Sequence, residues 1–137
     1  LSKEQIYTHE HVLLSSKNEQ RGFLCANILS EYYRLSVINT HLGLDKKERR
    51  IQISEILDYI YDIRGKKIIC GDFNEKNISI NGYNDMATYT NNQNLCTFYK
   101  SDSRIDYLFT SEIIQIDKYN VDNVKYSDHY PVIGEFR

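Results

Sequence analysis

Four short polar clusters stand at the ends of apolar stretches, and their side chains could together perform chemistry on a phosphate ester. They are Asn39-Thr40-His41, Gly71-Asp72-Phe73-Asn74, Arg104-Ile105-Asp106-Tyr107 and Ser127-Asp128-His129. Together they supply carboxylate oxygens, two imidazoles and an amide, a mixture that suits phosphate-ester chemistry with Mg²⁺. The sequence shows neither the compact His/Cys spacing of a zinc site nor a glycine-rich nucleotide loop.

Asp106 interrupts an apolar strand pattern. It lies between Ile105 and Tyr107, and a carboxylate on an apolar face is costly unless it has a partner. One candidate partner is His129, because an Asp beside an imidazole fixes the tautomer of the ring and supports its protonated form. The alternative is a surface ion pair with Arg104 or with a lysine. The pattern favours neither interpretation over the other.

Four further candidate residues each have a simpler interpretation beside the functional one. Asp72 and Asn74 flank Phe73, and both can face a crevice if Phe73 points inward; Asp and Asn also favour turns for their own backbone hydrogen bonds. His41 follows another strand and could be an ordinary loop histidine. Asp128 could hold a cation or could be a solvated surface acid. The functional interpretation is favoured because all the clusters can lie at the same edge of one sheet.

That shared place is predicted by a β–α–β unit. A strand rich in β-formers is expected over residues 34–39, a helix follows an N-cap at Asp45, and a second apolar strand is expected over 66–70. Two strands joined in this way should be parallel and adjacent or nearly so, and ligands collect beyond their carboxyl ends. We therefore expect His41 and Asp72 on the same edge of one sheet.

The remainder of the chain is predicted to be mostly short strands. Residues 1–20 are poorly patterned, apart from a short strand at 12–14. The segment 74–94 is expected to be irregular with at most one helical turn. A strand buried on both faces is expected over 23–29, and further strands over 95–99, 105–109, 113–116, 121–124 and 130–136.

The composition narrows the classes of protein. The 137 residues, 41% hydrophobic and 26% charged, are typical of one globular domain. The net charge of −2 shows no basic surface for tight, non-specific nucleic-acid binding. Three cysteines without metal spacing favour a reducing compartment, so a cytoplasmic location is slightly preferred. No stretch is long and apolar enough to predict a membrane span.

The four clusters, in this order, resemble successive motifs of the endonuclease/exonuclease/phosphatase superfamily, a group similar to deoxyribonuclease I. The resemblance runs from about Leu1 to the end of the chain. It implies an α+β fold, the four-layer α/β/β/α sandwich of the deoxyribonuclease I-like type, with the site at one end of two packed sheets. It also implies hydrolysis of a phosphate ester by an activated water, with Mg²⁺ as the cofactor and Mn²⁺ as an alternative.

The resemblance assigns roles to the acid and imidazole groups near the C-terminus. His129 resembles the histidine that acts as general base or contacts the phosphate. Asp106 resembles the acid that orients this histidine. Asp128 resembles a carboxylate on the metal side of the site.

The resemblance also assigns roles to the two earlier clusters. Asp72 resembles the acid that activates the nucleophile or protonates the leaving group. Asn74 resembles the amide that holds phosphate or water, and His41 resembles the donor to a phosphoryl oxygen. Donors placed where charge develops can each contribute roughly 10²–10³ in rate.

The chain departs from the family in one respect. Family members carry a metal-binding Asn and a Glu in an N-terminal half that precedes the residues similar to Leu1-Ser2-Lys3, and no matching motif is found here. Because the chain also lacks an initial methionine, we interpret residues 1–137 as a single, partial domain, the C-terminal half of the sandwich. We expect the missing N-terminal half to be its partner. The isolated piece should bind Mg²⁺ weakly, turn over little or nothing, and expose apolar sheet faces.

The substrate stays open within one chemical class. Nucleic acid, a lipid head group and a small phosphate ester are all compatible with the motifs. The alternative function is a non-catalytic binding or interaction domain that has retained the fold.

Overall fold

The computed structural model describes residues 2–29 and 31–137. Its helices and strands are β1 (Ile6–Leu13), β2 (Gly22–Leu29), β3 (Arg34–His41), α1 (Lys46–Ile60), β4 (Lys66–Asp72), β5 (Tyr83–Asp85), α2 (Met86–Tyr89), the 3₁₀ turn η1 (Tyr99–Ser101), β6 (Asp106–Ser111), β7 (Ile116–Val121) and β8 (Val132–Phe136).

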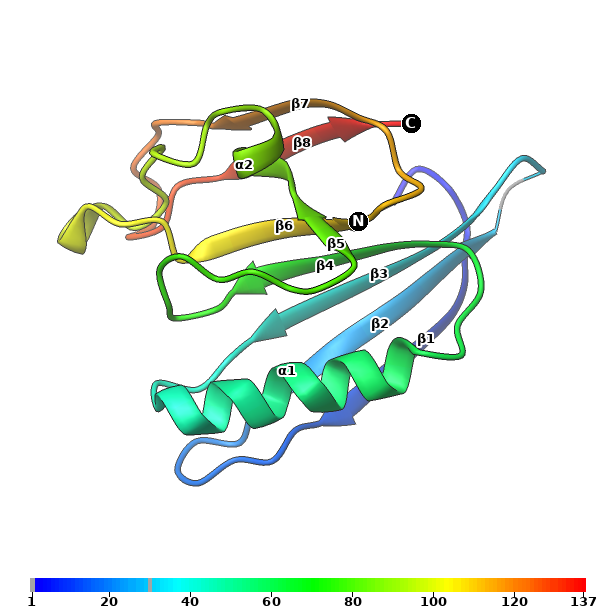
Figure 1. Ribbon diagram of the computed structural model, residues 1–137, viewed down its shortest axis with the longest axis horizontal. Helices are drawn as coiled ribbons and strands as arrows, with labels where there is room; N and C mark the ends of the chain where they lie inside the picture. The colour runs from blue at the N-terminus through cyan, green and yellow to red at the C-terminus, as the bar shows by residue number, and fades with distance from the viewer. Residues whose placement is uncertain (1, 30) are drawn as a thin grey trace.

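These elements form three layers. A six-stranded sheet has the strand order β1-β2-β3-β4-β6-β5, and β7 pairs with β8 in a separate two-stranded sheet. Helix α1 covers one face of the large sheet, and the β7–β8 sheet lies over part of the opposite face (Figure 1). The layers therefore follow the order helix, sheet, sheet of the predicted sandwich. No helix among the described residues is long and apolar enough to cross a membrane.

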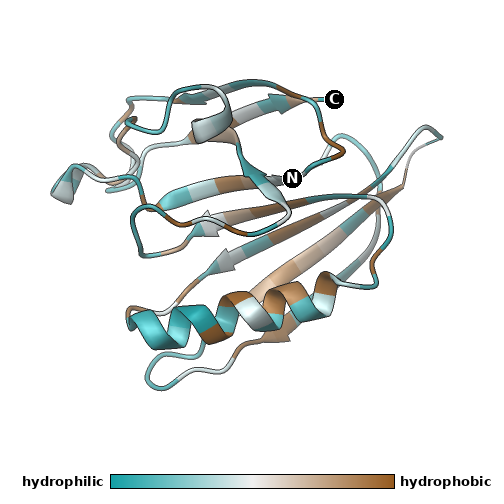
Figure 2. Ribbon diagram, viewed as in Figure 1, coloured by the Kyte–Doolittle hydropathy of each residue, from teal (hydrophilic) through white to brown (hydrophobic). Residues whose placement is uncertain are grey.

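The predicted β–α–β unit is confirmed. The carboxylate of Asp45 accepts hydrogen bonds from the backbone N–H groups of Lys47 and Glu48, at 3.1 and 3.0 Å, and so starts α1. Ile56 and Ile60 are buried on the side of α1 that packs on the sheet. The first turns of α1 are hydrophilic, whereas hydrophobic residues gather in its second half (Figure 2). Strands β3 and β4 are adjacent and parallel.

Aromatic packing anchors the turn after β4. Phe73 is fully buried, and its ring meets those of Tyr107 and Phe109 edge-on, with both centroid distances 5.4 Å. Burying a ring of this size stabilises the fold by about 2–3 kcal/mol. The inward position of Phe73 holds the backbone on either side of it against the sheet.

Several predicted strands differ from the observed ones. The N-terminal strand spans Ile6–Leu13 rather than 12–14, since pairing with β2 extends a strand that is mostly exposed and so has no hydrophobic alternation. Residues 95–99 form no strand beyond an isolated bridge at Phe98, because the chain turns into η1. The strands expected over 113–116 and 121–124 are replaced by one strand, β7.

Strand β2 is buried on one face, not on both as expected. Phe23 and Cys25 point toward α1 and are 2% and 0% exposed. Leu24, at the alternating position between them, is 43% exposed. Within the described residues, the face of the sheet opposite α1 is thus partly apolar and open beside β7–β8.

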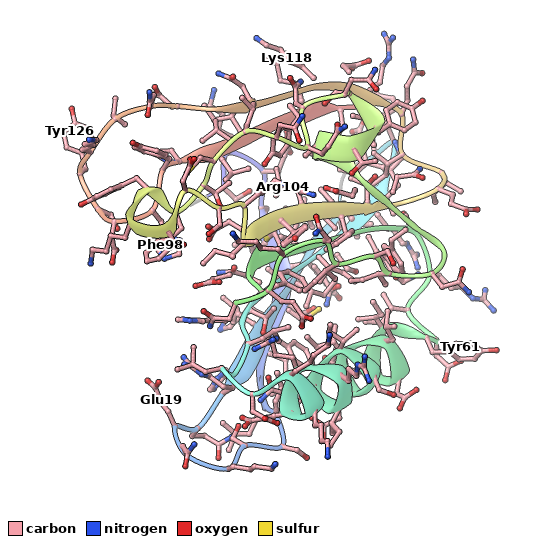
Figure 3. The ribbon with its side chains drawn as sticks, turned by 60° about the vertical axis from the view of Figure 1, so that its left-hand side comes forward. Glu19, Tyr61, Phe98, Arg104, Lys118 and Tyr126 are labelled. Atoms are coloured by element: carbon pink, nitrogen blue, oxygen red, sulfur yellow. The ribbon has the colours of Figure 1, made fainter. Side chains whose placement is uncertain are left out.

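A buried ion pair connects β5 and α2 to the start of β6. Both terminal nitrogens of Arg104 donate to the two carboxylate oxygens of Asp85, at 3.0 and 2.8 Å. The two side chains are only 10% and 9% exposed, and the guanidinium also lies 4.3 Å from the centroid of the Tyr107 ring. Arg104 lies beside β6, toward the β7–β8 sheet (Figure 3). This bidentate ion pair fixes the segment that leads into Asp106.

We predict that Asp85→Ala lowers the free energy of unfolding by about 3 kcal/mol, because it leaves the Arg104 charge buried without its partner. The matched control is Lys118→Ala, which breaks a pair with Glu135 whose side chains are 64% and 59% exposed and should cost less than about 1 kcal/mol. Urea denaturation measures both. Equal losses in the two variants would contradict this role for the buried pair.

Candidate active site

Three of the predicted site residues lie in one row across the sheet. His41, the last residue of β3, is the register partner of Asp72, the last residue of β4. Asp72 in turn is opposite Asp106, the first residue of β6. The carboxyl ends of β3 and β4 and the beginnings of β6 and β8 meet at one end of the molecule (Figure 1). The predicted shared edge of His41 and Asp72 is therefore confirmed.

Gly71 permits this row to form. Its φ is +129°, in the region that favours glycine, and a Cβ at this position would lie 1.9 Å from the carbonyl oxygen of Thr40. A side chain here would push β4 away from β3 immediately before Asp72. The close approach of the Thr40 carbonyl oxygen therefore explains why a glycine precedes Asp72.

His129 joins the row from the loop before β8. Its ring Nδ1 is 2.8 Å from Oδ2 of Asp106, with the two side chains 29% and 17% exposed. The Phe98 ring packs against the imidazole at a centroid distance of 4.7 Å. The structure thus has the Asp106–His129 pair. The alternative pair of Arg104 with Asp106 is not formed, since Arg104 binds Asp85.

Asp72 lies between two imidazoles. Its Oδ2 is 3.4 Å from Nε2 of His41 and 3.7 Å from Nε2 of His129. The second distance exceeds that of a hydrogen bond, so the His129 Nε2 is directed toward Asp72 without being bonded to it. His41 has a side chain that is 55% exposed, against 14% for Asp72. His41 therefore occupies the outer rim of the row and Asp72 its interior.

Asn74 has a structural role at the edge of the site. It adopts φ +50°, its backbone N–H donates to Oδ1 of Asp72 at 2.7 Å, and its side-chain amide donates to the Leu42 carbonyl at 2.8 Å. The turn interpretation of the Asp72–Asn74 pair is thus correct. It does not displace the functional one, because the same turn sets the orientation of the Asp72 carboxylate.

Asp128 lies outside the compact group. Its carboxylate is 40% exposed and accepts a hydrogen bond from Nζ of Lys100 at 2.8 Å. This hydrogen bond lowers the pKa of the Asp128 carboxyl. Among the described residues, the acidic and imidazole groups close enough to share a cation are Asp72, Asp106 and His129. The metal-side role of Asp128 stays a prediction.

The compact group has the chemistry of a metal site for a hard cation. One ligand atom from each of Asp72, Asp106 and His129 lies within 4.8 Å of the others. Two half-buried carboxylates close together repel each other, and a divalent cation between them would remove that cost. Carboxylate oxygens suit Mg²⁺ and Mn²⁺. The residues present therefore fit such an ion.

The electrostatics of Asp106 show the strain of this arrangement. Burial raises the pKa of the Asp106 carboxyl above its ordinary value, and hydrogen bonds with His129 and Thr97 pull it partly back. The nearby charge of Asp72 raises it further. Desolvation thus disfavours the charged form of Asp106, and carboxylates perturbed in this way are typical of functional sites.

Thr97 and Phe98 also belong to the site, and the sequence did not indicate them. They lie in a run, Leu95–Tyr99, whose β-formers gave no sign of a polar role. Thr97 is fully buried, and its Oγ1 accepts hydrogen bonds from the backbone N–H groups of Ile105 and Asp106. No local pattern could reveal contacts made across eight or nine positions of the chain.

The raised pKa of Asp106 predicts the pH dependence of stability in metal-free buffer. A folded-state pKa above the unfolded value of 3.8 favours the fold below pH 3.8, and that contribution is lost as the pH rises through the folded pKa. Asp106→Asn removes this titration. We expect the free energy of unfolding of the wild type, relative to Asp106→Asn, to decrease as the pH rises through that window. An increase over the same window, measured by urea titration, would contradict the desolvation cost.

Similarity to known proteins was found among solved structures. No protein-family model matches the sequence, and no curated protein matches it. Solved structures do match. An endonuclease/exonuclease/phosphatase from Beutenbergia cavernae is similar over 96% of this chain and 45% of its own, with a TM-score of 0.82 and 19% identity.

Two further solved structures are similar to the same extent. TDP2 of D. rerio, complexed with a single-strand DNA product, matches over 97% of this chain and 68% of its own, with a TM-score of 0.81 and 18% identity. A mannosyl-6-phosphatase of Bacteroides thetaiotaomicron matches over 97% of this chain and 67% of its own, with a TM-score of 0.78 and 19% identity. The chain thus spans about half to two thirds of the length of these structures.

At such low identity these matches establish architecture. The three layers and the row of strand ends agree with part of the four-layer sandwich that the resemblance implied. The chain has the fold of the endonuclease/exonuclease/phosphatase proteins, the deoxyribonuclease I-like sandwich, of which it forms a part.

Proposed function

We propose that the protein is a phosphoric ester hydrolase that depends on a divalent cation, with Mg²⁺ as the natural ion. One observation carries the proposal. The imidazole of His129 is bonded to Asp106 through Nδ1, and its other nitrogen is directed toward Asp72. The His129 imidazole, a second carboxylate and the His41 imidazole thus lie at one partly exposed edge, which supports a role for His129 as a base.

In the proposed reaction, Asp106 and His129 act as a unit. Oδ2 of Asp106 accepts a hydrogen bond from the Nδ1–H group of His129, with 2.8 Å between Nδ1 and Oδ2. In this tautomer the lone pair of the ring is on Nε2. Nε2 can then accept a proton from a water or, once protonated, donate to a phosphoryl oxygen. The packing of Phe98 against the ring limits its rotation.

Asp72, His41 and Asn74 complete the proposed machinery. Asp72 receives or supplies the proton that the water or the leaving group exchanges, and its 14% exposure keeps it partly shielded from solvent. His41 lies on the outer side of Asp72 and donates to a phosphoryl oxygen. The Asn74 amide contributes a further donor while it holds the Asp72 turn.

In this proposal a divalent cation would be held by carboxylate oxygens of Asp72 and Asp106, beside the His129 imidazole. Asp128 is a second metal-side candidate, which requires its carboxylate to leave Lys100. When bound, the cation would neutralise charge on the phosphoryl oxygens and favour ionisation of a water.

The substrate class follows from what similar structures are known to bind or cleave. The D. rerio TDP2 structure contains a single-strand DNA product, and the Bacteroides neighbour is a mannosyl-6-phosphatase. These two proteins handle phosphate esters of different kinds on one fold. The proposal for this chain is therefore limited to a phosphate ester. Nucleic-acid ends, lipid head groups and small phosphate esters are the substrates to compare.

We predict that His129→Ala lowers kcat for a generic phosphodiester or phosphomonoester by roughly 10³-fold, because it removes the general base. The control is His9→Ala, since His9 is exposed on β1 and belongs to none of the clusters. The assay uses full-length protein, with Mg²⁺ and with EDTA. EDTA should abolish the wild-type activity, and His9→Ala should retain it.

Two outcomes would redirect the assignment. Hydrolysis by His129→Ala at the wild-type rate would remove the histidine from the mechanism. If the full-length wild type hydrolysed none of the three substrate kinds with Mg²⁺ or Mn²⁺, the alternative of a non-catalytic binding domain would replace the enzyme.

A further inference from the structure

Thr97 is connected to both halves of the Asp106–His129 pair. On one side, its Oγ1 accepts hydrogen bonds from the backbone N–H groups of Ile105 and Asp106, at 3.0 and 3.1 Å. On the other side, its carbonyl oxygen accepts the backbone N–H of Tyr130, the residue after His129, at 2.8 Å. One residue therefore links the start of β6 to the loop that carries the histidine.

The segment around Thr97 adds further connections to the same two places. The backbone N–H groups of Thr97 and Phe98 both donate to the carbonyl oxygen of Ser103, at 3.0 and 2.9 Å, which closes the loop before β6. Phe98 forms an isolated bridge with His129, and its ring packs against the imidazole. In Figure 3, Phe98 lies with the 3₁₀ turn at the end of the molecule, away from Lys118.

Burial makes the Thr97 hydroxyl hard to replace. The residue is 0% exposed, so water is excluded from its immediate surroundings. Without Oγ1, the N–H groups of Ile105 and Asp106 would lose their acceptor in a buried place, and an unsatisfied buried group costs roughly 1–3 kcal/mol. The backbone at Asp106 would then have to move to find other partners. A small shift there changes the 2.8 Å contact with His129.

We propose that Thr97 is a positioning residue whose hydroxyl fixes the backbone at Ile105–Asp106 and so sets the hydrogen bond between Asp106 and His129. Its effect on turnover rests on the proposed hydrolase function, but its effect on the His129 ring does not. A displacement of about 1 Å at a catalytic group can cost on the order of 10²-fold in rate. Thr97 acts through Asp106 and His129 and does not itself need to contact the substrate.

The chain provides a matched control in Thr110. This residue is also fully buried, and it lies on the same strand as Asp106. Among the described residues, its Oγ1 finds no hydrogen-bond partner. Thr97→Val and Thr110→Val are therefore the same chemical change at the same burial. They differ in whether the hydroxyl that is lost accepts backbone hydrogen bonds.

The test compares Thr97→Val, Thr97→Ser and Thr110→Val in full-length protein. Two quantities are measured: the NMR signal of the His129 Nδ1–H proton, which a carboxylate partner shifts downfield, and kcat with KM for a phosphate ester. Thr97→Val should lose or shift this signal upfield and reduce kcat roughly 10–100-fold with KM changed less than about threefold. Thr97→Ser, which keeps Oγ1, should restore both quantities, and Thr110→Val should leave both unchanged.

Three results would overturn the proposal. The first is an unaltered His129 signal in folded Thr97→Val. The second is a loss of the signal in Thr97→Ser, which would assign the effect to the methyl group. The third is a loss of the signal in Thr110→Val equal to that in Thr97→Val. If Thr97→Val does not fold, Thr97→Ala, which also lacks Oγ1, takes its place with the same expected signals. If the wild type hydrolyses no phosphate ester, the proposed function fails, while the histidine signal still tests the role of Thr97.

Discussion

The pairing register of three strands is the constraint on which the rest of the site depends. A parallel pairing places His41 opposite Asp72, and an antiparallel pairing places Asp72 opposite Asp106. Because side chains alternate between faces along a strand, a slip of one residue in either pairing would send one of these groups to the other face of the sheet. The buried Phe73, packed edge-on against Tyr107 and Phe109, and the close approach at Gly71 oppose such a slip. The chemistry of this edge is thus a consequence of packing in the core.

The site is arranged at a cost to stability. Two carboxylates, 14% and 17% exposed, face the same imidazole, and burial raises the pKa of Asp106. The fold offsets this cost with local hydrogen bonds, such as that from the Asn74 backbone to Asp72. The buried Arg104–Asp85 ion pair holds the approach to β6 from the other side. Groups that a purely structural sheet would keep apart are brought together here, as at many active sites.

The sequence alone allowed much of this site to be predicted, because its residues follow strongly patterned elements. The parallel pair β3–β4 followed from a helix with a clear N-cap between two apolar runs, and that pair places His41 beside Asp72. The partner of Asp106 could not be chosen from the pattern, since Arg104 and His129 were equally good candidates. Only the geometry, in which Arg104 turns to Asp85, separates them.

The failures have physical reasons as well. The run Leu95–Tyr99 has strand propensity, but tertiary contacts with Ser103 and His129 turn it into a loop, and so the role of Thr97 was hidden. Strand β1 was largely missed because its side chains are mostly exposed, which removes the alternation that sequence analysis depends on. Long-range pairing and one-sided burial are properties of the fold that no local window contains.

The central claim is that His41, Asp72, Asp106 and His129 form one cation-dependent phosphoryl site. Its most direct test is paramagnetic broadening of NMR signals by trace Mn²⁺, a cation suited to carboxylate ligands. The account predicts that signals of Asp72, Asp106 and His129 broaden first and together, followed by those of His41, while those of His9 persist. Broadening that begins at another acidic surface and leaves His129 and Asp72 sharp would contradict it.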